Sequence, residues 1–260
     1  MSEPRRRRIL ITGASSGLGA EMARQFAAKG HDVALAARRR ERLAGLEEEI
    51  RTANPAIRVA SYDLDVNDHD QIFAVTKQVV ADFDGLDRFI VNAGLGKGAR
   101  IGSGKFYANR ETAETNFVAA IAQCEAAMEQ FYAQNSGHLV VISSISAMRG
   151  MPSSMTTYAA TKAGIAHIAE GIRSDLGRLA EKGKSHDIAV TTLFPGYIAS
   201  EMNERVQQQV KFMVDTQTGV RSMVKAIDAE VAETAVPRWP WVPIGAVMKR
   251  APLAIVRKII

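Results

Sequence analysis

Short apolar runs alternate with longer helical segments along most of this chain, and no other feature constrains its fold as strongly. The runs that read as buried strands are 8–12, 32–37, 57–62, 87–92, 138–144 and 187–196. Helical periodicity occupies 17–29, a charged segment ending near 53, and then 68–83, about 111–134 and about 157–181. Such alternation implies right-handed crossovers and a parallel sheet covered on both faces. We therefore predict a doubly wound α/β fold with about seven strands.

Bulk composition excludes several other classes of protein. The chain has 260 residues, of which 47% are hydrophobic and 23% charged, as in folded globular proteins. It contains no run of 18 apolar residues that would span a bilayer. Although the formal charge is +5, no module typical of nucleic-acid binding accompanies it. The single cysteine, Cys124, fits a reducing compartment, so we expect a cytoplasmic protein. Without a repeat or a linker, residues 1–260 are predicted to form one domain.

A glycine-rich stretch, "TGASSGLG" at 12–19, joins the first predicted strand to the first helix. Gly13 would permit a tight turn, Gly17 would let the backbone approach a ligand, and Gly19 would allow close helix packing. The free N–H groups and the dipole of such a helix start favour a pyrophosphate. The stretch therefore predicts a dinucleotide site in a Rossmann-type fold, with a purely structural turn as the alternative.

The end of the second predicted strand should meet the adenosine ribose of that dinucleotide. An acidic residue there would hold the 2′-hydroxyl of NAD, but the chain has Ala36, Ala37, Arg38 and Arg39. A guanidinium can bind a 2′-phosphate through two charge-assisted hydrogen bonds. We therefore expect NADP(H), with Arg38 as the main contact and Arg39 or Arg42 assisting. A solvated helix start is the alternative interpretation.

The stretch "YAATK" at 158–162 puts Tyr158 and Lys162 one helical turn apart, with small residues between them. Residues four apart share a helix face, so the phenol and the ammonium can lie side by side. An ordinary surface helix with an extended lysine would have the same pattern.

Taken in order, these motifs make the sequence resemble the short-chain dehydrogenase/reductase family from residue 8 to about residue 200. The shared motifs are TGASSGLG, Asp65-Val66, "NAG" at 92–94, Asn116, "ISS" at 142–144, YAATK and Pro195-Gly196. The resemblance implies hydride transfer between a nicotinamide and a carbonyl or secondary alcohol of a small molecule.

Residue by residue, the resemblance implies a catalytic tetrad of Asn116, Ser144, Tyr158 and Lys162. The cofactor residues that it or the glycine turn indicates are Gly13, Ser15, Ser16, Gly17, Leu18, Gly19, Arg38, Arg39, Asp65, Val66, Asn92, Ala93, Gly94, Tyr158, Lys162, Pro195, Gly196, Ile198 and Ser200. The family usually places its serine 13 residues before the tyrosine. Ser144 lies 14 before Tyr158 and Ser146 lies 12 before it, so Ser146 stays an alternative.

The chemistry of hydride transfer explains why a lysine should stand beside the tyrosine. Reduction of a carbonyl needs a proton, and a free tyrosine with a pKa near 10 releases one reluctantly near neutrality. We expect the Lys162 cation to lower the pKa of Tyr158, so that the phenol acts as acid in reduction and as base in oxidation. Ser144 would orient the substrate oxygen, and Asn116 would hold a water that links Lys162 to solvent.

Beyond Ser200 the resemblance weakens. Residues 200–230 are predicted to form one or two helices that cover a lipophilic substrate or merely the core, with apolar positions at Val206, Val210, Met213 and Val214. The tail 243–260 is amphipathic and follows Trp239 and Trp241. It fits a peripheral membrane contact, a flap over the active site or an oligomer contact.

Three further expectations concern partners, metals and other functions. The resemblance implies a homodimer or homotetramer through helices 111–134 and 157–181. The five histidines lack metal-ligand spacing, so no metal is expected. A non-catalytic NADP(H)-binding sensor and a membrane-surface interaction protein on the same fold are the alternative functions.

Overall fold

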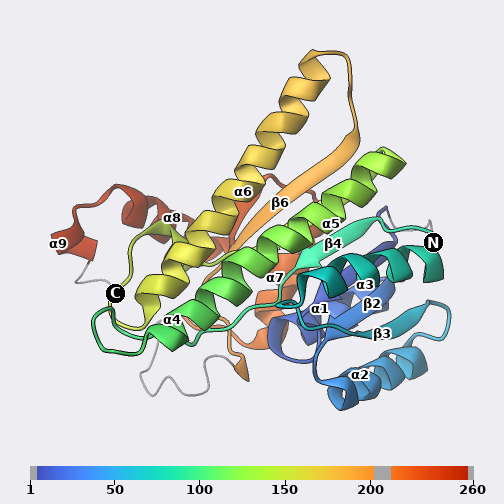
Figure 1. The fold of residues 1–260 in the computed structure, drawn as a ribbon, viewed down its shortest axis with the longest axis horizontal. Coiled ribbons are helices and arrows are strands. Elements are labelled where there is room, and N and C mark those ends of the chain that lie inside the picture. Colours follow the sequence, from blue (N-terminus) through green and yellow to red (C-terminus); the bar gives the residue numbers. More distant parts are fainter. Residues whose placement is uncertain (1–4, 202–211, 257–260) are drawn as a thin grey trace.

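A computed structural model describes residues 5–201 and 212–256 and contains one seven-stranded parallel sheet with helices on both faces (Figure 1). The strand order is β3-β2-β1-β4-β5-β6-β7. The strands are β1 Arg8–Thr12, β2 Asp32–Ala37, β3 Val59–Asp63, β4 Arg88–Val91, β5 Ser136–Ile142, β6 Asp187–Pro195 and β7 Glu233–Val236. The predicted fold class is confirmed. The order reverses between β1 and β4, and ligands of such sheets bind at the carboxyl ends of strands beside that reversal.

The helices divide between the two faces of the sheet. They are α1 Gly17–Ala28, α2 Arg40–Ala53, α3 His69–Asp82, α4 Phe106–Ala113, α5 Ala119–Gln134, α6 Met155–Glu181, α7 Thr216–Asp228, α8 Arg238–Arg250 and α9 Leu253–Val256. One hydrophobic cluster joins the sheet to α3, α5 and α6, and a second joins it to α1, α2 and α7. A third, smaller cluster places α8 against β6 and β7.

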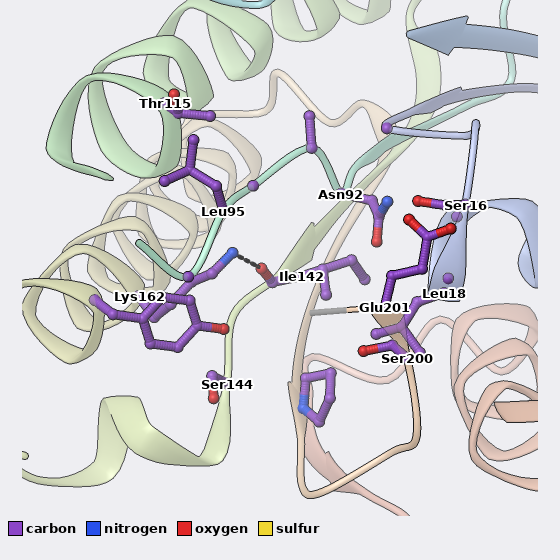
Figure 2. Close-up of a pocket in the computed structure, with 18 of the residues that line it drawn as sticks. Ser16, Leu18, Asn92, Leu95, Thr115, Ile142, Ser144, Lys162, Ser200 and Glu201 are labelled. Atoms are coloured by element: carbon purple, nitrogen blue, oxygen red, sulfur yellow. Dashed lines mark hydrogen bonds between the residues drawn. The ribbon is translucent and has the colours of Figure 1, made fainter. Parts of the chain in front are cut away.

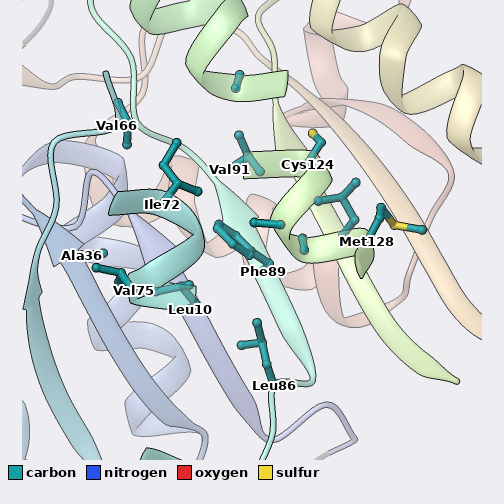
Figure 3. Packing of buried hydrophobic residues seen from close by; sticks show 14 of the residues in the cluster. Leu10, Ala36, Val66, Ile72, Val75, Leu86, Phe89, Val91, Cys124 and Met128 are labelled. Atoms are coloured by element: carbon teal, nitrogen blue, oxygen red, sulfur yellow. The ribbon is translucent and has the colours of Figure 1, made fainter. Parts of the chain in front are cut away.

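Each central strand supplies side chains to both clusters, because successive residues of a strand point to opposite faces. In β1, Leu10 joins the α3, α5 and α6 side, while Ile9 and Ile11 join the other. Burial on both faces is why these strands are continuously apolar rather than alternating. Figure 3 shows Phe89 among the α3 and α5 side chains, with Cys124 nearby. Burial raises the pKa of the Cys124 thiol to about 12, so this cysteine is a packing residue.

Several bounds differ from the sequence prediction; β5, for example, spans 136–142 rather than 138–144. The helix expected from 111 begins at Phe106 and contains a π-helical turn, Glu114–Val118, before α5. The third strand begins at Val59 rather than 57. The strand β7 was not predicted, because no apolar run marks it in the sequence. It is a four-residue edge strand, and its first residue, Glu233, is exposed. In the region 200–230 the described helix is α7, while Val206 and Val210 lie outside the described residues.

No helix in residues 5–201 and 212–256 is long and apolar enough to cross a membrane.

A buried polar cluster holds the sheet together at the end opposite the carboxyl ends of the strands. Arg88, only 1% exposed, donates from Nε to Nδ1 of His138 at 3.0 Å and from Nη1 to Asp228 at 3.2 Å. Nε2 of His138 lies 2.9 Å from Oγ1 of Thr191, which donates its own proton to the Val231 carbonyl. His138 is therefore neutral, with its proton on Nε2. Burial, followed by the charge of Arg88, holds the pKa of His138 well below its usual value.

This cluster predicts that acid destabilises the fold through His138. The unfolded chain binds a proton to this histidine below about pH 6.5 and the folded chain does not, so stability is lost as pH falls through that value. Between pH 7.5 and 5.5 we expect a loss of about 1.4 kcal/mol from His138, and burial lowers the pKa of His31 in the same direction. Urea midpoints of the wild type and His138→Gln at both pH values measure this. An equal acid-induced loss in the two proteins would contradict it.

Candidate active site

A pocket of about 670 Å³ opens at the carboxyl ends of the strands. Its glycine-turn end carries Ser16, Leu18 and Glu201, and its other end carries Lys162 and Ser144 (Figure 2). All nineteen predicted cofactor residues line this one pocket: Gly13, Ser15, Ser16, Gly17, Leu18, Gly19, Arg38, Arg39, Asp65, Val66, Asn92, Ala93, Gly94, Tyr158, Lys162, Pro195, Gly196, Ile198 and Ser200. Of the predicted tetrad, Ser144, Tyr158 and Lys162 line it and Asn116 does not.

In the glycine turn, a side chain would clash with neighbouring atoms at Gly13 and Gly19 but not at Gly17. A Cβ on Gly13, whose φ is +66°, would lie 2.9 Å from Cα of Ala93. A Cβ on Gly19 would lie 2.4 Å from the carbonyl oxygen of Gly13. Gly17, at φ +53°, meets nothing closer than Cβ of Ser200 at 3.5 Å. No side chain caps the start of α1, so its first N–H groups suit an anion in the pocket.

A threonine missed by sequence reasoning joins this turn to the end of β4. Oγ1 of Thr12 accepts hydrogen bonds from the backbone N–H groups of Asn92 and Ala93, each at 3.1 Å. The Asn92 side-chain amide donates in return to the Thr12 carbonyl at 2.9 Å. Thr12 is fully buried, and its hydrogen bonds connect the end of β1 to the pocket-lining residues Asn92 and Ala93.

The arginines after β2 are already partnered. Arg38 lies 3.8 Å from the carboxylate of Asp65, and both side chains are exposed. Arg39 donates to Ser15 at 3.0 Å and to Ser16, so Arg39, rather than Arg38, holds the glycine turn. Sequence reasoning also missed Glu201, whose carboxylate receives hydrogen bonds from Arg39 at 3.1 Å and from Arg42. These two hydrogen bonds hold the pKa of Glu201 below its usual value.

The catalytic end is formed where α6 crosses the end of β5. Nζ of Lys162 lies 5.9 Å from the centroid of the Tyr158 ring, so the expected juxtaposition of phenol and ammonium is found. The same Nζ donates to the Ile142 carbonyl at 2.9 Å (Figure 2). Behind it, Oγ of Ser143 donates to the Lys162 carbonyl at 2.7 Å and fixes α6 to the strand end.

Protonation of this pair differs from the expectation. Burial raises the pKa of Tyr158, against an opposing hydrogen bond from Ser144, and burial lowers the pKa of Lys162 to about 8. The predicted lowering of the Tyr158 pKa is therefore wrong for the chain by itself. The physical reason is that desolvation penalises both charged forms, and the nearest partner of the ammonium is the Ile142 carbonyl rather than the phenol.

Both candidate serines line the pocket, and Ser144 is the more exposed of the two, since Ser146 is 3% exposed. Ser146 donates to Oγ of Ser144 from its N–H at 3.2 Å and from its hydroxyl at 2.9 Å. A serine oxygen accepts two hydrogen bonds, so the proton of Ser144 is left to donate. Ser144 is also the serine that hydrogen-bonds Tyr158. The choice between Ser144 and Ser146 as the residue that orients a substrate stays a prediction.

Comparisons with known proteins identify the family of the chain. The family model described as short chain dehydrogenase matches residues 7–211. The chain belongs to the short-chain dehydrogenase family. An uncharacterised oxidoreductase of Mycobacterium tuberculosis is 47% identical over 253 residues, which is 97% of each chain. Like that relative, this short-chain dehydrogenase is an oxidoreductase, and its family acts on small molecules.

Solved structures resemble this short-chain dehydrogenase in fold. A short-chain dehydrogenase/reductase from Burkholderia phymatum in complex with NAD has a TM-score of 0.82 and 18% identity, and the match covers 100% of this chain and 97% of that one. A short-chain dehydrogenase from Burkholderia cenocepacia in complex with NADP has a TM-score of 0.77 and 22% identity, with 91% and 98% covered. These neighbours therefore include complexes with both dinucleotides.

Asn116, the fourth predicted catalytic residue of this short-chain dehydrogenase, is hydrogen-bonded to the backbone of the pocket-lining Leu95. Asn116 lies in the π-helical turn Glu114–Val118 and is 1% exposed. Its side-chain amide donates to the Leu95 carbonyl and accepts from the Leu95 N–H, both at 2.8 Å. π-Helical turns often occur at functional sites because they turn a side chain out of helical register. The expected water beside Asn116 stays a prediction.

Several further side chains that no motif indicated also line the pocket. They are Leu95, Ile145, Met151, Met155 and Tyr197. Tyr197 packs edge-on against the buried Trp241 of α8, with ring centroids 5.5 Å apart. Within the described residues no group of three His, Cys, Asp or Glu side chains could hold a metal ion.

Proposed function

We propose that this short-chain dehydrogenase transfers a hydride between NADP(H) and the carbonyl or secondary alcohol of a lipophilic small molecule. The observation that carries the proposal is a single pocket that joins an uncapped glycine turn to a buried Lys162 and to the partly exposed Tyr158 and Ser144. The leucine, isoleucine and methionine side chains that line the same pocket support a lipophilic substrate.

The residues present fit a dinucleotide. The start of α1 offers its N–H groups to a pyrophosphate, and Gly17 leaves the space that such a group needs. At the other end, a Cβ on Gly94 would crowd Oδ1 of Asn116 at 3.1 Å and Nζ of Lys162 at 3.4 Å, so a glycine here leaves room for both groups. When bound, the nicotinamide supplies or accepts the hydride.

Tyr158 moves the proton. In reduction its Oη gives a proton to the developing alkoxide, and in oxidation the phenolate takes one from the alcohol. Ser144 donates its hydrogen bond to the same substrate oxygen, because its own oxygen is saturated by Ser146. Lys162 places a buried positive charge beside the phenolate that remains after the proton has gone.

A pair of serine variants tests this division of roles. Ser144→Ala removes the donor to the substrate oxygen, and we expect kcat to fall by about 10² to 10³. Ser146→Ala removes only one of the two hydrogen bonds that Ser144 accepts. We therefore expect kcat to fall by about tenfold or less and KM to change less than kcat. Steady-state kinetics with one water-soluble ketone measures both. Larger damage from Ser146→Ala than from Ser144→Ala would reverse the assignment.

The preference for NADP(H) rests on the arginines after β2. Their cationic groups stand at the strand end where a 2′-phosphate would lie, and no acidic residue precedes them in β2 after Asp32. The Glu201 carboxylate already accepts hydrogen bonds from Arg39 and Arg42, so a phosphate would have to compete with it for these two cations.

Replacement of Arg38 by alanine is expected to weaken NADP⁺ binding by about tenfold or more and to change NAD⁺ binding much less, because Arg38 does not hold the glycine turn. Glu201→Gln should strengthen NADP⁺ binding several-fold, because one competing anion is removed. Arg51→Ala, at the far end of α2, is the matched control for loss of a cation. Calorimetric titration with each dinucleotide gives the three affinities. Parallel losses for NAD⁺ and NADP⁺ would contradict the proposed preference.

The experiment that tests the function as a whole follows NADPH oxidation against a panel of ketones, aldehydes and quinones. Turnover with at least one class supports the reductase. Tight NADPH binding with no turnover across the panel would favour the alternative of a non-catalytic sensor.

We also propose a homodimer or homotetramer built through the α4–α5 and α6 helices. Phe106 and Tyr107 at the start of α4 are 74% and 60% exposed, which is unusual for large side chains on a free surface.

A further inference from the structure

The C-terminal part of the chain holds the entire excess of positive charge. The sequence has 33 lysines and arginines against 28 aspartates and glutamates. Five of the basic residues lie in 238–260, and no acidic residue follows Glu233. Residues 1–237 therefore carry 28 basic and 28 acidic side chains and are formally neutral. The charge of this protein is a property of one short segment.

Helix α8 in that segment has an outward side of unusual composition. Its inward side is Trp241, Gly245 and Met248, spaced four and three residues apart, which pack on β6, β7 and the turn after Ser144. The outward side should be polar in a helix that meets only water. Instead Val242, Ala246 and Val247 are exposed on it, followed by Lys249 and Arg250, and Trp239 precedes them at a kink where the backbone is not helical. These six residues are called the α8 face.

Large apolar groups on this face are strongly exposed. Trp239 is 80% exposed, Val247 is 49% exposed, and Leu253 of the neighbouring α9 is 53% exposed. The ammonium of Lys249 lies 5.9 Å over the ring of Phe194, and neither Lys249 nor Arg250 forms an ion pair within the described residues. Exposed tryptophan and valine beside unpaired cations mark a binding surface rather than a solvated one.

We propose that the α8 face docks peripherally on an anionic membrane surface. A bilayer with anionic lipids offers negative charge within a few ångströms of hydrocarbon, which matches basic side chains next to an apolar stripe with tryptophan. A second copy of this chain matches it less well. In a two-fold contact the same patch meets itself, and the α8 face has no acidic residue that could pair with the Lys249 and Arg250 cations of the other copy.

The position of α8 connects this surface to the apolar end of the pocket. Gly245 packs 3.2 Å from Ile145, measured from a Cβ built on the glycine, and Trp241 packs on Gly196. Ile145 and Gly196 both line the pocket. Docking through the α8 face would thus bring a lipophilic-substrate pocket close to a bilayer. Only this last consequence rests on the proposed function; the docking itself does not.

Flotation of the full-length protein with vesicles tests the docking without any assay of catalysis. We expect binding to vesicles of 70% phosphatidylcholine and 30% phosphatidylserine, little binding to pure phosphatidylcholine, and weakening by added salt. Lys249→Gln with Arg250→Gln should lower binding at least about tenfold. Val242→Ser with Val247→Ser should lower it as well, with no change in charge.

Matched controls separate this surface from a general effect of charge. Lys182→Gln with Lys184→Gln removes the same charge just beyond α6, whose far end is distant from α8 (Figure 1), and should leave binding unchanged. The emission of Trp239 should shift to the blue with anionic vesicles, and Trp239→Phe should abolish that shift. Circular dichroism and cofactor binding verify that each variant is folded.

Three results would overturn the proposal. They are absence of binding to anionic vesicles, equal binding by wild type and the Lys249/Arg250 variant, and dissociation of an oligomer by the Val242/Val247 variant in sedimentation. The last result would identify the α8 face as a contact between copies of the chain.

Discussion

Tyr158→Phe is expected to lower kcat for carbonyl reduction by about 10³-fold or more while leaving NADPH binding within a few-fold of wild type. The substitution removes only the hydroxyl that supplies the proton, and positioned general acids contribute about 10² to 10⁴. The ring stays, so its packing beside Lys162 stays as well.

Tyr197→Phe is the matched control for this variant. Tyr197 also lines the pocket, but it packs on Trp241 and is assigned no proton transfer. Removal of the Tyr197 hydroxyl should change kcat by no more than a few-fold. Initial rates of NADPH oxidation, together with NADPH titrations monitored by fluorescence, give both quantities. A Tyr158→Phe enzyme with most of its turnover would remove this tyrosine from the mechanism.

Lys162→Met should lower both kcat and cofactor affinity. The buried cation is lost beside the phenolate, and the Ile142 carbonyl loses its hydrogen-bond donor, which costs about 1–3 kcal/mol of stability. The pH dependence of kcat/KM in the wild type also tests whether the Lys162 ammonium is required. Burial lowers the pKa of Lys162 to about 8 and raises that of Tyr158, so Lys162 is the first of the two to lose its proton as pH rises. We therefore expect kcat/KM for reduction to fall above about pH 8.

Lys97→Met, in the loop beside α4, removes an exposed lysine that pairs with Glu111 and serves as the control. It should keep the wild-type profile and melting temperature. A flat wild-type profile from pH 7 to 9.5, or a Lys162→Met variant with undiminished kcat, would show that the ammonium does not support the phenol.

The central strands could be predicted because burial on both sides leaves a continuous apolar signal. The observed β1 and β2 have the bounds expected from the sequence, 8–12 and 32–37. β7 gave no such signal, since it is an edge strand with only Ala235 and Val236 buried. The π-helical turn at Asn116 was also not predictable, because its cause is the tertiary contact with Leu95 rather than a local pattern.

For the site, motif positions were more predictable than the interactions between side chains. The residues of TGASSGLG, NAG and YAATK that were expected in the site do line one pocket. Glu201 escaped notice because its partners Arg39 and Arg42 lie about 160 residues away in sequence. The direction of the Tyr158 pKa was wrong because the desolvation of a group depends on its packed surroundings, which sequence spacing does not reveal.

A crystal structure of the protein soaked with NADP⁺ tests the central claim most directly, because it needs no knowledge of the substrate. The account predicts continuous density from the glycine turn, with the adenosine phosphate near Arg38 and Arg39, to a nicotinamide ring beside Tyr158 with room for one carbonyl group between them. Density confined to another surface, or a nicotinamide ring separated from Tyr158 by the pocket wall, would contradict it.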